Sequence, residues 1–312
     1  MLRSILQIVD ETEKTGKLFW EVVLEDDTEE RQVSRRESMA QMLTIWSAMQ
    51  DAADSYTGTR RSVSGLVGGD GLKMRQYNLR GKNLAGDYVG EVIAEALSMA
   101  ESNACMRRIV AAPTAGACGV LPAVLLPLYY REELSQQQVL EALYVASGIG
   151  AVVAHRASIA GASGGCQAEI GTASAMAAGA LVALRGGDAR AIAHAVSMTL
   201  KNLMGLVCDP VAGLVEVPCV KRNVIGAMNA ISAADMALAG IESRIPVDEV
   251  EYVQRAVDRM IRGGKAVQLS YRWNHPEMGE VTVRCSGIRT RNENGKILLE
   301  GYHRILTGVE GA

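Results

Sequence analysis

The feature that most constrains this chain is a long stretch that carries almost no charge. From Ile109 to Ile241, only 15 of 133 residues are Asp, Glu, Lys or Arg. Helices with so few charges cannot each present a full polar face to water. We therefore expect an interior helical bundle that is covered by other parts of the chain, by a partner, or by both.

Composition favours a mainly α fold. Aromatic residues make up 4% of the chain, whereas Ala, Gly, Val, Leu and Met are frequent. Such small contact residues favour closely packed helices over a β-sandwich. The charged N-terminal region contains an amphipathic helical pattern at 38–46. Further along the chain we expect helices at about 89–107, 136–155, 171–185, 189–204 and 219–240.

The uncharged run Ile109–Tyr130 is long enough to cross a membrane. Because it contains Pro113, Pro122 and Pro127, we interpret it as a buried loop followed by a helix. Acidic residues follow the N-terminus too early for a secretory signal, so we expect a soluble, cytoplasmic protein. A net charge of -3 and a pI near 5.9 give no reason to expect nucleic acid or an anionic membrane as a partner.

The character of the sequence changes after Glu249. Residues 251–312 hold 17 charges, and 267–273 and 281–285 alternate as strands do. Asn294-Gly295 is typical of a hairpin turn. We therefore expect a helical domain at 1–249 and a small α+β module at 250–312.

Six cysteines are present, none of them in a CxxC motif, and a disulfide framework is not expected in a chain of this kind. Three lie near expected helix ends, where thiolates can be stabilised: Cys166, Cys208 and Cys219. If they converge, three thiolates suit a [4Fe–4S] cluster with one open iron that can act as a Lewis acid. On spacing alone, scattered cysteines in an Ala-rich core are more often ordinary buried residues.

The sequence around these cysteines resembles the α subunit of bacterial iron–sulfur-dependent L-serine dehydratases over roughly residues 1–249. The run GLVCDPVAGLVEVPC at 205–219 is the most specific part. Five segments carry the resemblance, in this order: Ser64–Asp70, Ala112–Gly116, Gly164–Glu169, Gly205–Cys219 and Lys221–Asn223.

The resemblance implies a lyase that converts L-serine to pyruvate and ammonia. It implies that Cys166, Cys208 and Cys219 hold a [4Fe–4S] cluster whose open iron binds the serine hydroxyl, and that no pyridoxal phosphate takes part. It also implies a catalytic loop at Thr114, Ala115 and Gly116, although the same residues would form an ordinary turn before a helix.

Two further groups of residues follow from the resemblance. Lys221 is expected to be catalytic, although a salt bridge from the Lys221–Asn223 segment to Asp209 or Glu216 would satisfy its charges equally well. A substrate-binding role, against that of a plain tight turn in the glycine-rich loop, is expected for Ser64, Gly68, Gly69, Asp70 and Asn223.

Other reactive side chains are interpreted as structural. His155 and His194 titrate near neutral pH, but each lies in an Ala- and Val-rich helix and is expected to be a core or interface residue. Cys105, Cys118 and Cys285 are expected to be packing or structural residues.

Two departures from the family pattern matter. The family's Ser-Ser-His-Thr-x-Gly-Pro motif, carried by a β domain or β subunit, does not occur here, so we expect a separate β subunit. Family α subunits usually continue into a glycine-rich tail near the active site, and loss of that tail would reduce activity. Here the residues after 250 instead resemble the second half of a PAS domain, on the following segments: Tyr271–Pro276, Val281, Arg284–Gly287 and Glu300–His303.

Three alternatives stay open at this point. One is a cysteine desulfidase built on the same type of domain, which would release hydrogen sulfide from cysteine. Another is a non-catalytic iron–sulfur or PAS-linked sensor, which would bind a cluster without forming pyruvate. A helical structural protein with incidental cysteines would bind no iron.

Overall fold

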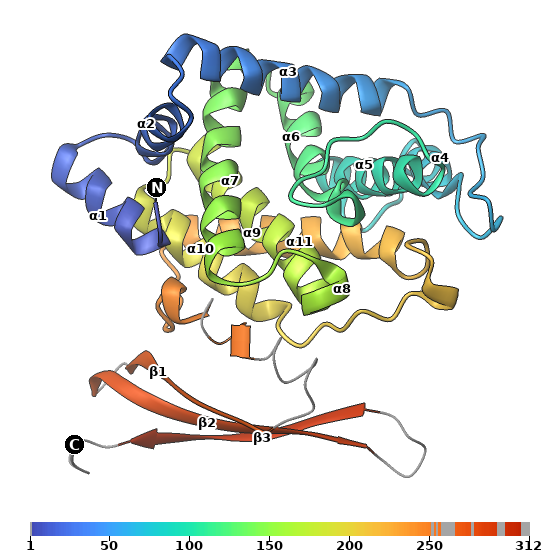
Figure 1. Ribbon diagram of the computed structural model, residues 1–312. Helices are drawn as coiled ribbons and strands as arrows, with labels where there is room; N and C mark the ends of the chain where they lie inside the picture. The colour runs from blue at the N-terminus through green and yellow to red at the C-terminus, as the bar shows by residue number, and fades with distance from the viewer. Residues whose placement is uncertain are drawn as a thin grey trace.

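The protein is mainly helical, with a small antiparallel sheet at its C-terminal end (Figure 1). The computed structural model describes residues 2–250, 253, 255–256, 266–275, 278–291 and 297–306. Its elements are α1 (Ile5–Thr15), α2 (Phe19–Arg31), α3 (Arg35–Asp54), α4 (Asp70–Asn78), α5 (Gly86–Ala104), η1 (Ala115–Ala117), α6 (Val120–Arg131), α7 (Gln136–Arg156), α8 (Gly161–Gly164), α9 (Cys166–Leu184), α10 (Ala189–Asn202), η2 (Val211–Gly213), α11 (Cys219–Leu238), β1 (Val267–His275), β2 (Gly279–Arg291) and β3 (Ile297–Leu306).

Helix α9 is the centre of the helical body. Sixteen of its 19 residues are buried, and α6, α7, α10 and α11 pack around it (Figure 1). Its Ala, Gly, Ser and Thr residues let these neighbours approach closely: a Cβ atom at Gly179 would overlap the Cδ1 atom of Ile149 on α7. The charge-poor stretch therefore forms an interior bundle, as its composition predicts.

Cover for this bundle comes from the charged N-terminal region. Helices α2 and α3 pack against α7, with α3 crossing one end of it, and α1 packs against α10 (Figure 1). Their apolar faces bury Ile8, Phe19 and Trp46. Helix α3 begins with a capping box, in which Ser34 and Glu37 each satisfy the other's backbone amide. The expected helix at 38–46 is thus the middle of α3.

The uncharged run Ile109–Tyr130 is a loop, the short turn η1 and then α6, which confirms the expected order of loop and helix. The expectation of a buried loop is wrong, because of residues 109–116 only Ala112 is buried. All residues from Val120 to Leu128 are buried. Among the described residues, only α7 is long and apolar enough to cross a membrane, and 67% of its most apolar window is buried inside the protein. That burial is typical of a core helix.

The C-terminal strands form a meander in the order β1-β2-β3, with Leu269 opposite Cys285 and Cys285 opposite His303. β1 and β2 contain the two expected strands, and β3 follows the predicted hairpin turn, for which no strand range was given. The predicted hairpin turn at Asn294-Gly295 lies outside the described residues, in the connection between β2 and β3.

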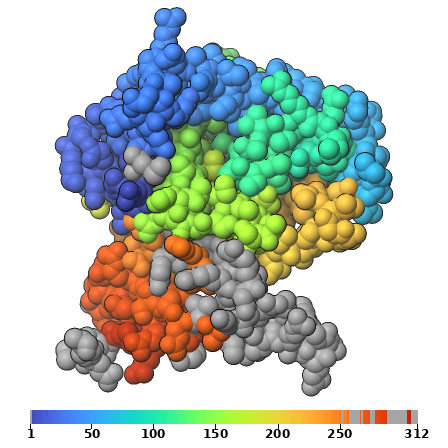
Figure 2. All heavy atoms as spheres, viewed as in Figure 1, coloured from blue at the N-terminus to red at the C-terminus, as the bar shows by residue number. Residues whose placement is uncertain are grey.

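The sheet forms a separate lobe against the base of the helical body (Figure 2). Its own small core contains Leu269, Tyr271 and Val283, which pack with Val253 and Ala256. Met204 and Ile245 of the helical body contact both this core and the main one.

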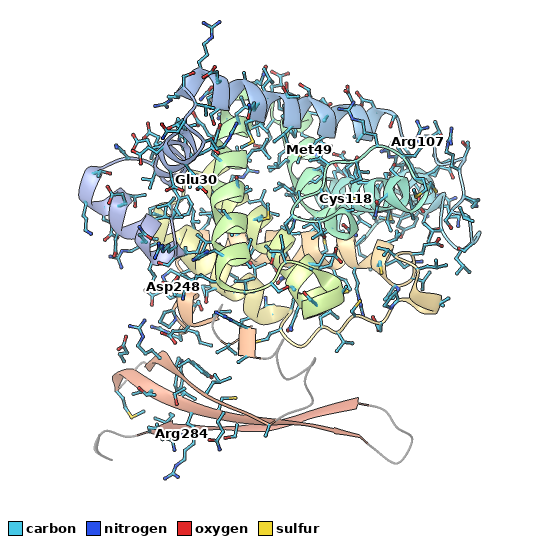
Figure 3. The ribbon with its side chains drawn as sticks, viewed as in Figure 1. Glu30, Met49, Arg107, Cys118, Asp248 and Arg284 are labelled. Atoms are coloured by element: carbon cyan, nitrogen blue, oxygen red, sulfur yellow. The ribbon has the colours of Figure 1, made fainter. Side chains whose placement is uncertain are left out.

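Polar contacts also lie at this junction. Arg272 Nε donates to Glu249 at 2.8 Å, and Asp248, labelled in Figure 3, pairs with Arg156 at 3.7 Å. We propose a domain boundary at residue 249, between the helical body and the C-terminal module. The PAS resemblance stays a prediction; Pro276 lies outside the described residues, as do the side chains of 274–275 and 300–303.

Candidate active site

Two core helices begin with a cysteine at the same side of the protein. Cys166 is the first residue of α9 and Cys219 is the first residue of α11. Cys208 lies in the loop that leads from α10 to α11. Cys166 is buried, Cys219 is half-buried and Cys208 is exposed, so the three cysteines lie at different depths below the surface.

The loop that carries Cys208 is attached to the start of α9. The Gln167 amide donates to the Leu206 carbonyl at 2.9 Å, and the Gly205 amide donates to the Gln167 side chain at 2.6 Å. Gly165 permits this approach, because a Cβ atom there would lie 2.8 Å from the Leu206 carbonyl oxygen. This arrangement places Cys208 beside Cys166.

Arg222 joins the segments that carry the three cysteines. It lies on α11, one turn after Cys219, and is 9% exposed. Its Nη1 donates to Cys166 Sγ at 3.0 Å and to the Val207 carbonyl at 3.0 Å, and lies 2.5 Å from Asp209 Oδ1. One of the two expected salt bridges from the Lys221–Asn223 segment is therefore present.

The thiols influence each other electrostatically. Burial, together with the nearby Cys166 and Cys208, raises the pKa of Cys219 to about 11, against the lowering effect of Arg222. Burial also raises the pKa of Cys166, while the hydrogen bond from Arg222 lowers it. Three thiols thus share one site, and binding a cation there would relieve their mutual repulsion.

The donor set fits an iron–sulfur cluster better than a single metal ion. In the described part of the chain, no three His, Cys, Asp or Glu side chains are placed to hold one ion. A four-iron cluster does not need such a group, because each thiolate ligates a different iron. Three cysteines would leave the fourth iron without a protein thiolate.

The Thr114–Gly116 loop lies between the starts of α9 and α11. On one side, the Thr114 hydroxyl donates to Glu169, one turn after Cys166. On the other side, Asn223 Nδ2 donates to the Gly116 carbonyl at 2.8 Å and to the Cys219 carbonyl at 3.2 Å. The predicted residues Thr114, Ala115, Gly116 and Asn223 are therefore brought to the cysteines, and Asn223 holds the loop.

The glycine-rich loop approaches the site through two carboxylates. Glu216 accepts hydrogen bonds from Ser62, at 2.8 Å, and from Ser64. Since Glu216 lies three residues before Cys219, these bonds place Ser64 near the cysteines.

Glu101 holds the other end of the glycine-rich loop. This buried carboxylate on α5 accepts the Tyr56 hydroxyl and the amides of Gly69, at 3.1 Å, and Asp70, at 2.7 Å. Gly68 has a φ of +132° and packs against the Arg60 carbonyl. The Gly69 and Asp70 amides are therefore occupied by a carboxylate of the protein itself.

Asp70 and Lys221 are brought together at the surface. Asp70 pairs with Lys73 at 2.8 Å and with Lys221 at 3.5 Å, and these lysines, Lys73 first, lower the pKa of Asp70. Lys221 is an exposed side chain, 67% accessible. It lies at the rim of the site, outside the buried part.

Comparison with known proteins identifies the family of this chain. The family model for the serine dehydratase alpha chain matches residues 11–266. The chain belongs to this family. It is 42% identical, over 87% of its length and 89% of the relative, to the probable L-serine dehydratase alpha chain of Bacillus subtilis. It is 40% identical, over 80% of its length and 86% of the relative, to the L-serine dehydratase alpha chain of Peptoniphilus asaccharolyticus.

A longer relative gives a second point of reference for this alpha-chain family member. L-serine dehydratase 1 of Escherichia coli is 35% identical over 81% of this chain, and that match covers 56% of the relative. The family match also continues beyond residue 249, through the segment in which Val253 and Ala256 contact the sheet.

Three carboxylates of this serine dehydratase alpha chain were not predicted as functional: Glu101, Glu169 and Glu216. Glu169 and Glu216 are two of the few charges between Ile109 and Ile241. A charge in a segment destined for burial needs a partner or a role, and this signal was available from the sequence. Glu101 follows an ordinary amphipathic pattern, and only the fold brings it to the Gly69 amide.

The remaining reactive residues lie outside the site. His155 is exposed, so it is not a core residue, and the interface alternative stays a prediction. His194 is half-buried on α10, and burial lowers its pKa. Cys118 is buried between α5 and α6 (Figure 3), where burial raises its pKa to about 12 and its thiol contacts the Met99 carbonyl at 3.6 Å. It is a packing residue.

Proposed function

We propose that this chain is the α subunit of an L-serine dehydratase, which converts L-serine to pyruvate and ammonia. A [4Fe–4S] cluster held by Cys166, Cys208 and Cys219 is the proposed cofactor, without pyridoxal phosphate. The observation that carries this proposal is the meeting of these three cysteines at one site, in a chain that belongs to the serine dehydratase alpha family.

When bound, such a cluster would supply Lewis-acid chemistry toward the substrate hydroxyl. The residues of the chain have distinct roles around it. Arg222 holds Cys166 and the Cys208 loop together. Asn223 and Glu169 fix the Thr114–Gly116 loop, which we propose as a wall of the substrate pocket.

We place the residues of the glycine-rich loop at the rim of this pocket. Ser64 is held by Glu216, and Asp70 is paired with Lys221. In this proposal the Lys221 ammonium faces the substrate carboxylate, because it carries three N–H donors. Ser64, whose single O–H is given to Glu216, keeps the loop beside the substrate. The Gly68–Gly69 backbone acts indirectly, by holding Asp70 in place through Glu101.

The proposed partner is a β subunit. Relatives named alpha chain match this chain along most of their length, whereas L-serine dehydratase 1 of Escherichia coli is nearly twice as long as its matching region. This difference supports a second chain that supplies the remaining catalytic groups, including the acceptor of the α-proton. We also propose a cytoplasmic location, where the reducing environment keeps thiols available as ligands.

Pyruvate formation tests the function. The chain, reconstituted anaerobically and mixed with its β subunit, should release pyruvate and ammonia from L-serine, and a carbonyl reagent that traps pyridoxal phosphate should have no effect. Cys219→Ala should abolish release, and Cys105→Ala should not. Release of hydrogen sulfide from L-cysteine in place of pyruvate from L-serine would overturn the assignment in favour of a desulfidase.

A further inference from the structure

Glu169 is a half-buried carboxylate on the inner side of the site. It lies on α9, one turn after Cys166, and its Oε1 accepts the Thr114 hydroxyl. Within the described residues, no Lys, Arg or His forms an ion pair with it. Withdrawal of a carboxylate from water is unfavourable unless a cation or hydrogen bonds compensate.

Two separate short elements, η1 and α8, lie close to this carboxylate. A Cβ atom at Gly116 would lie 2.6 Å from Oε1, and one at Gly161 would lie 2.8 Å from Oε2. Either side chain would displace the carboxylate. Glycine at both positions therefore leaves room for Glu169 to stand beside the Thr114 loop.

The carboxylate lies close to the cysteines. Glu169 lies one turn after Cys166, and the Thr114–Gly116 loop that it holds is bonded on its other side to Asn223, one turn after Cys219. Placing another anion beside three thiols is unfavourable in isolation. The arrangement becomes favourable when a cationic group occupies the space beside Glu169.

The other carboxylates of the site already have partners. Asp209 pairs with Arg222, and Asp70 pairs with Lys73 and Lys221. Glu216 accepts two serine hydroxyls, and Glu101 accepts backbone amides. Glu169 has one hydrogen bond from Thr114, and its Oε2 is left for a ligand.

We infer that Glu169 recognises the α-ammonium group of the amino-acid substrate, with Oε2 accepting its N–H while Thr114 holds Oε1. The inference rests on the proposed function and adds a determinant of specificity to it. The site should then distinguish an α-amino acid from a 3-hydroxy acid of the same skeleton, because only the amino acid neutralises Glu169.

Binding of two ligands tests this inference. L-serine and 3-hydroxypropionate share a carboxylate and a β-hydroxyl, and only L-serine carries an ammonium group. Dissociation constants would be measured by calorimetry on the iron-reconstituted chain. Glu169→Gln should weaken L-serine binding about 10- to 100-fold, the range for a lost hydrogen bond between charged groups. The affinity of this variant for 3-hydroxypropionate should stay within about twofold, since this ligand has no ammonium group to contact Glu169.

A second variant moves the carboxylate without removing it. Gly161→Ala places a methyl group against Oε2 and should also weaken L-serine selectively. Glu29→Gln, an exposed change on α2, is the matched control and should alter neither affinity. Iron content and thermal unfolding of each variant show whether the site is intact.

The outcomes separate this inference from the proposed function. Equal weakening of both ligands, unchanged L-serine binding, or loss of iron in Glu169→Gln would overturn the recognition role while the wild-type chain still binds iron and L-serine. A wild-type chain that binds neither iron nor L-serine would overturn the proposed function and this inference together.

Discussion

Single side chains connect the segments of the site, and Arg222 connects the most. Its guanidinium contacts Cys166, the Val207 carbonyl and Asp209 from a position one turn after Cys219. Guanidinium geometry suits this role, because one rigid group carries several donors in a plane. Asn223 does the same for the Thr114–Gly116 loop from the next position on α11.

We predict that Arg222→Gln lowers the free energy of unfolding by about 1 to 3 kcal/mol, because buried acceptors lose a charged donor. The same change should lower the iron content after reconstitution, since the Cys208 loop loses its attachment. Urea unfolding and an iron assay measure the two effects. Arg190→Gln removes an exposed ion pair with Glu13 and should change stability by no more than about 0.5 kcal/mol. Equal effects of the two substitutions would contradict the role of Arg222.

Asn223→Ala should lower the free energy of unfolding more than Arg222→Gln does. Asn223 is fully buried, accepts the Gly119 amide at 2.9 Å and donates to the Gly116 carbonyl. Its loss leaves these groups unpaired, and we expect a cost of about 2 to 4 kcal/mol in the free energy of unfolding. Asn202→Ala, at an exposed amide pair, is the comparison. An Asn223 variant as stable as the Asn202 variant would show that the loop is held in another way.

At the scale of elements, close helix contacts position the site. Helix α9 carries Cys166 and Glu169 at its start because its small residues let it run through the middle of the body. The N-terminal ends of α9 and α11 then lie at one side of the protein, and the Thr114 loop crosses between them. Helix packing therefore determines where the cysteines meet.

Two glycines of α9 test this statement. Gly179→Ala should lower the free energy of unfolding by about 1 to 3 kcal/mol, because its Cβ would overlap Ile149 on α7. Gly171→Ala has its nearest contact 3.9 Å away, at Leu203 Cβ, and should stabilise by up to about 1 kcal/mol through helix propensity. The opposite signs should appear in thermal unfolding. Similar destabilisation by both substitutions would contradict the packing argument.

Much of the helical arrangement could be predicted from the sequence. The expected helices at 136–155, 189–204 and 219–240 correspond to α7, α10 and α11 within two residues at each end. Helix α9 begins at Cys166, five residues before the expected start, because Gly165 ends α8 with a positive φ and the Leu206 carbonyl accepts the Gln167 amide. The Leu206 carbonyl is distant in sequence from Gln167, so the local sequence pattern does not indicate this hydrogen bond.

Only part of the site could be predicted, because contacts between distant segments of the chain determine the rest. Cys166, Cys208, Cys219, Thr114 and Asn223 were found through sequence motifs, and the fold brings them together. Glu169 and Glu101 were missed because their importance depends on which backbone groups face them. Strand β3 was predicted only indirectly, through the hairpin turn at Asn294-Gly295, and its pairing with β2 defines its range.

At the scale of the whole molecule, the sheet and the helical body have separate cores. Leu269, Tyr271 and Val283 form a core of their own, which touches the main core through Met204 and Ile245. Of the proposed cluster ligands, Cys166 and Cys219 begin helices of the main core, and Cys208 lies in the loop attached to the start of α9. Disturbance of the sheet should therefore spare the cluster site.

Leu269→Asp tests this separation. A charge at this buried position should loosen the sheet and increase limited proteolysis within residues 266–306. The iron content should be unchanged. Thr282→Asp, at an exposed position of β2, should leave proteolysis as in the wild type. Loss of iron in the Leu269 variant alone would show that the sheet supports the cluster site.

The most direct measurement is iron content after anaerobic reconstitution with iron and sulfide, in the wild type and four single-cysteine variants. We predict about four irons per chain in the wild type and in Cys105→Ala. Cys166→Ala, Cys208→Ala and Cys219→Ala should each lose the cluster. A wild-type chain without stoichiometric iron, or full iron content in any of these three variants, would contradict the proposal that these cysteines hold a [4Fe–4S] cluster.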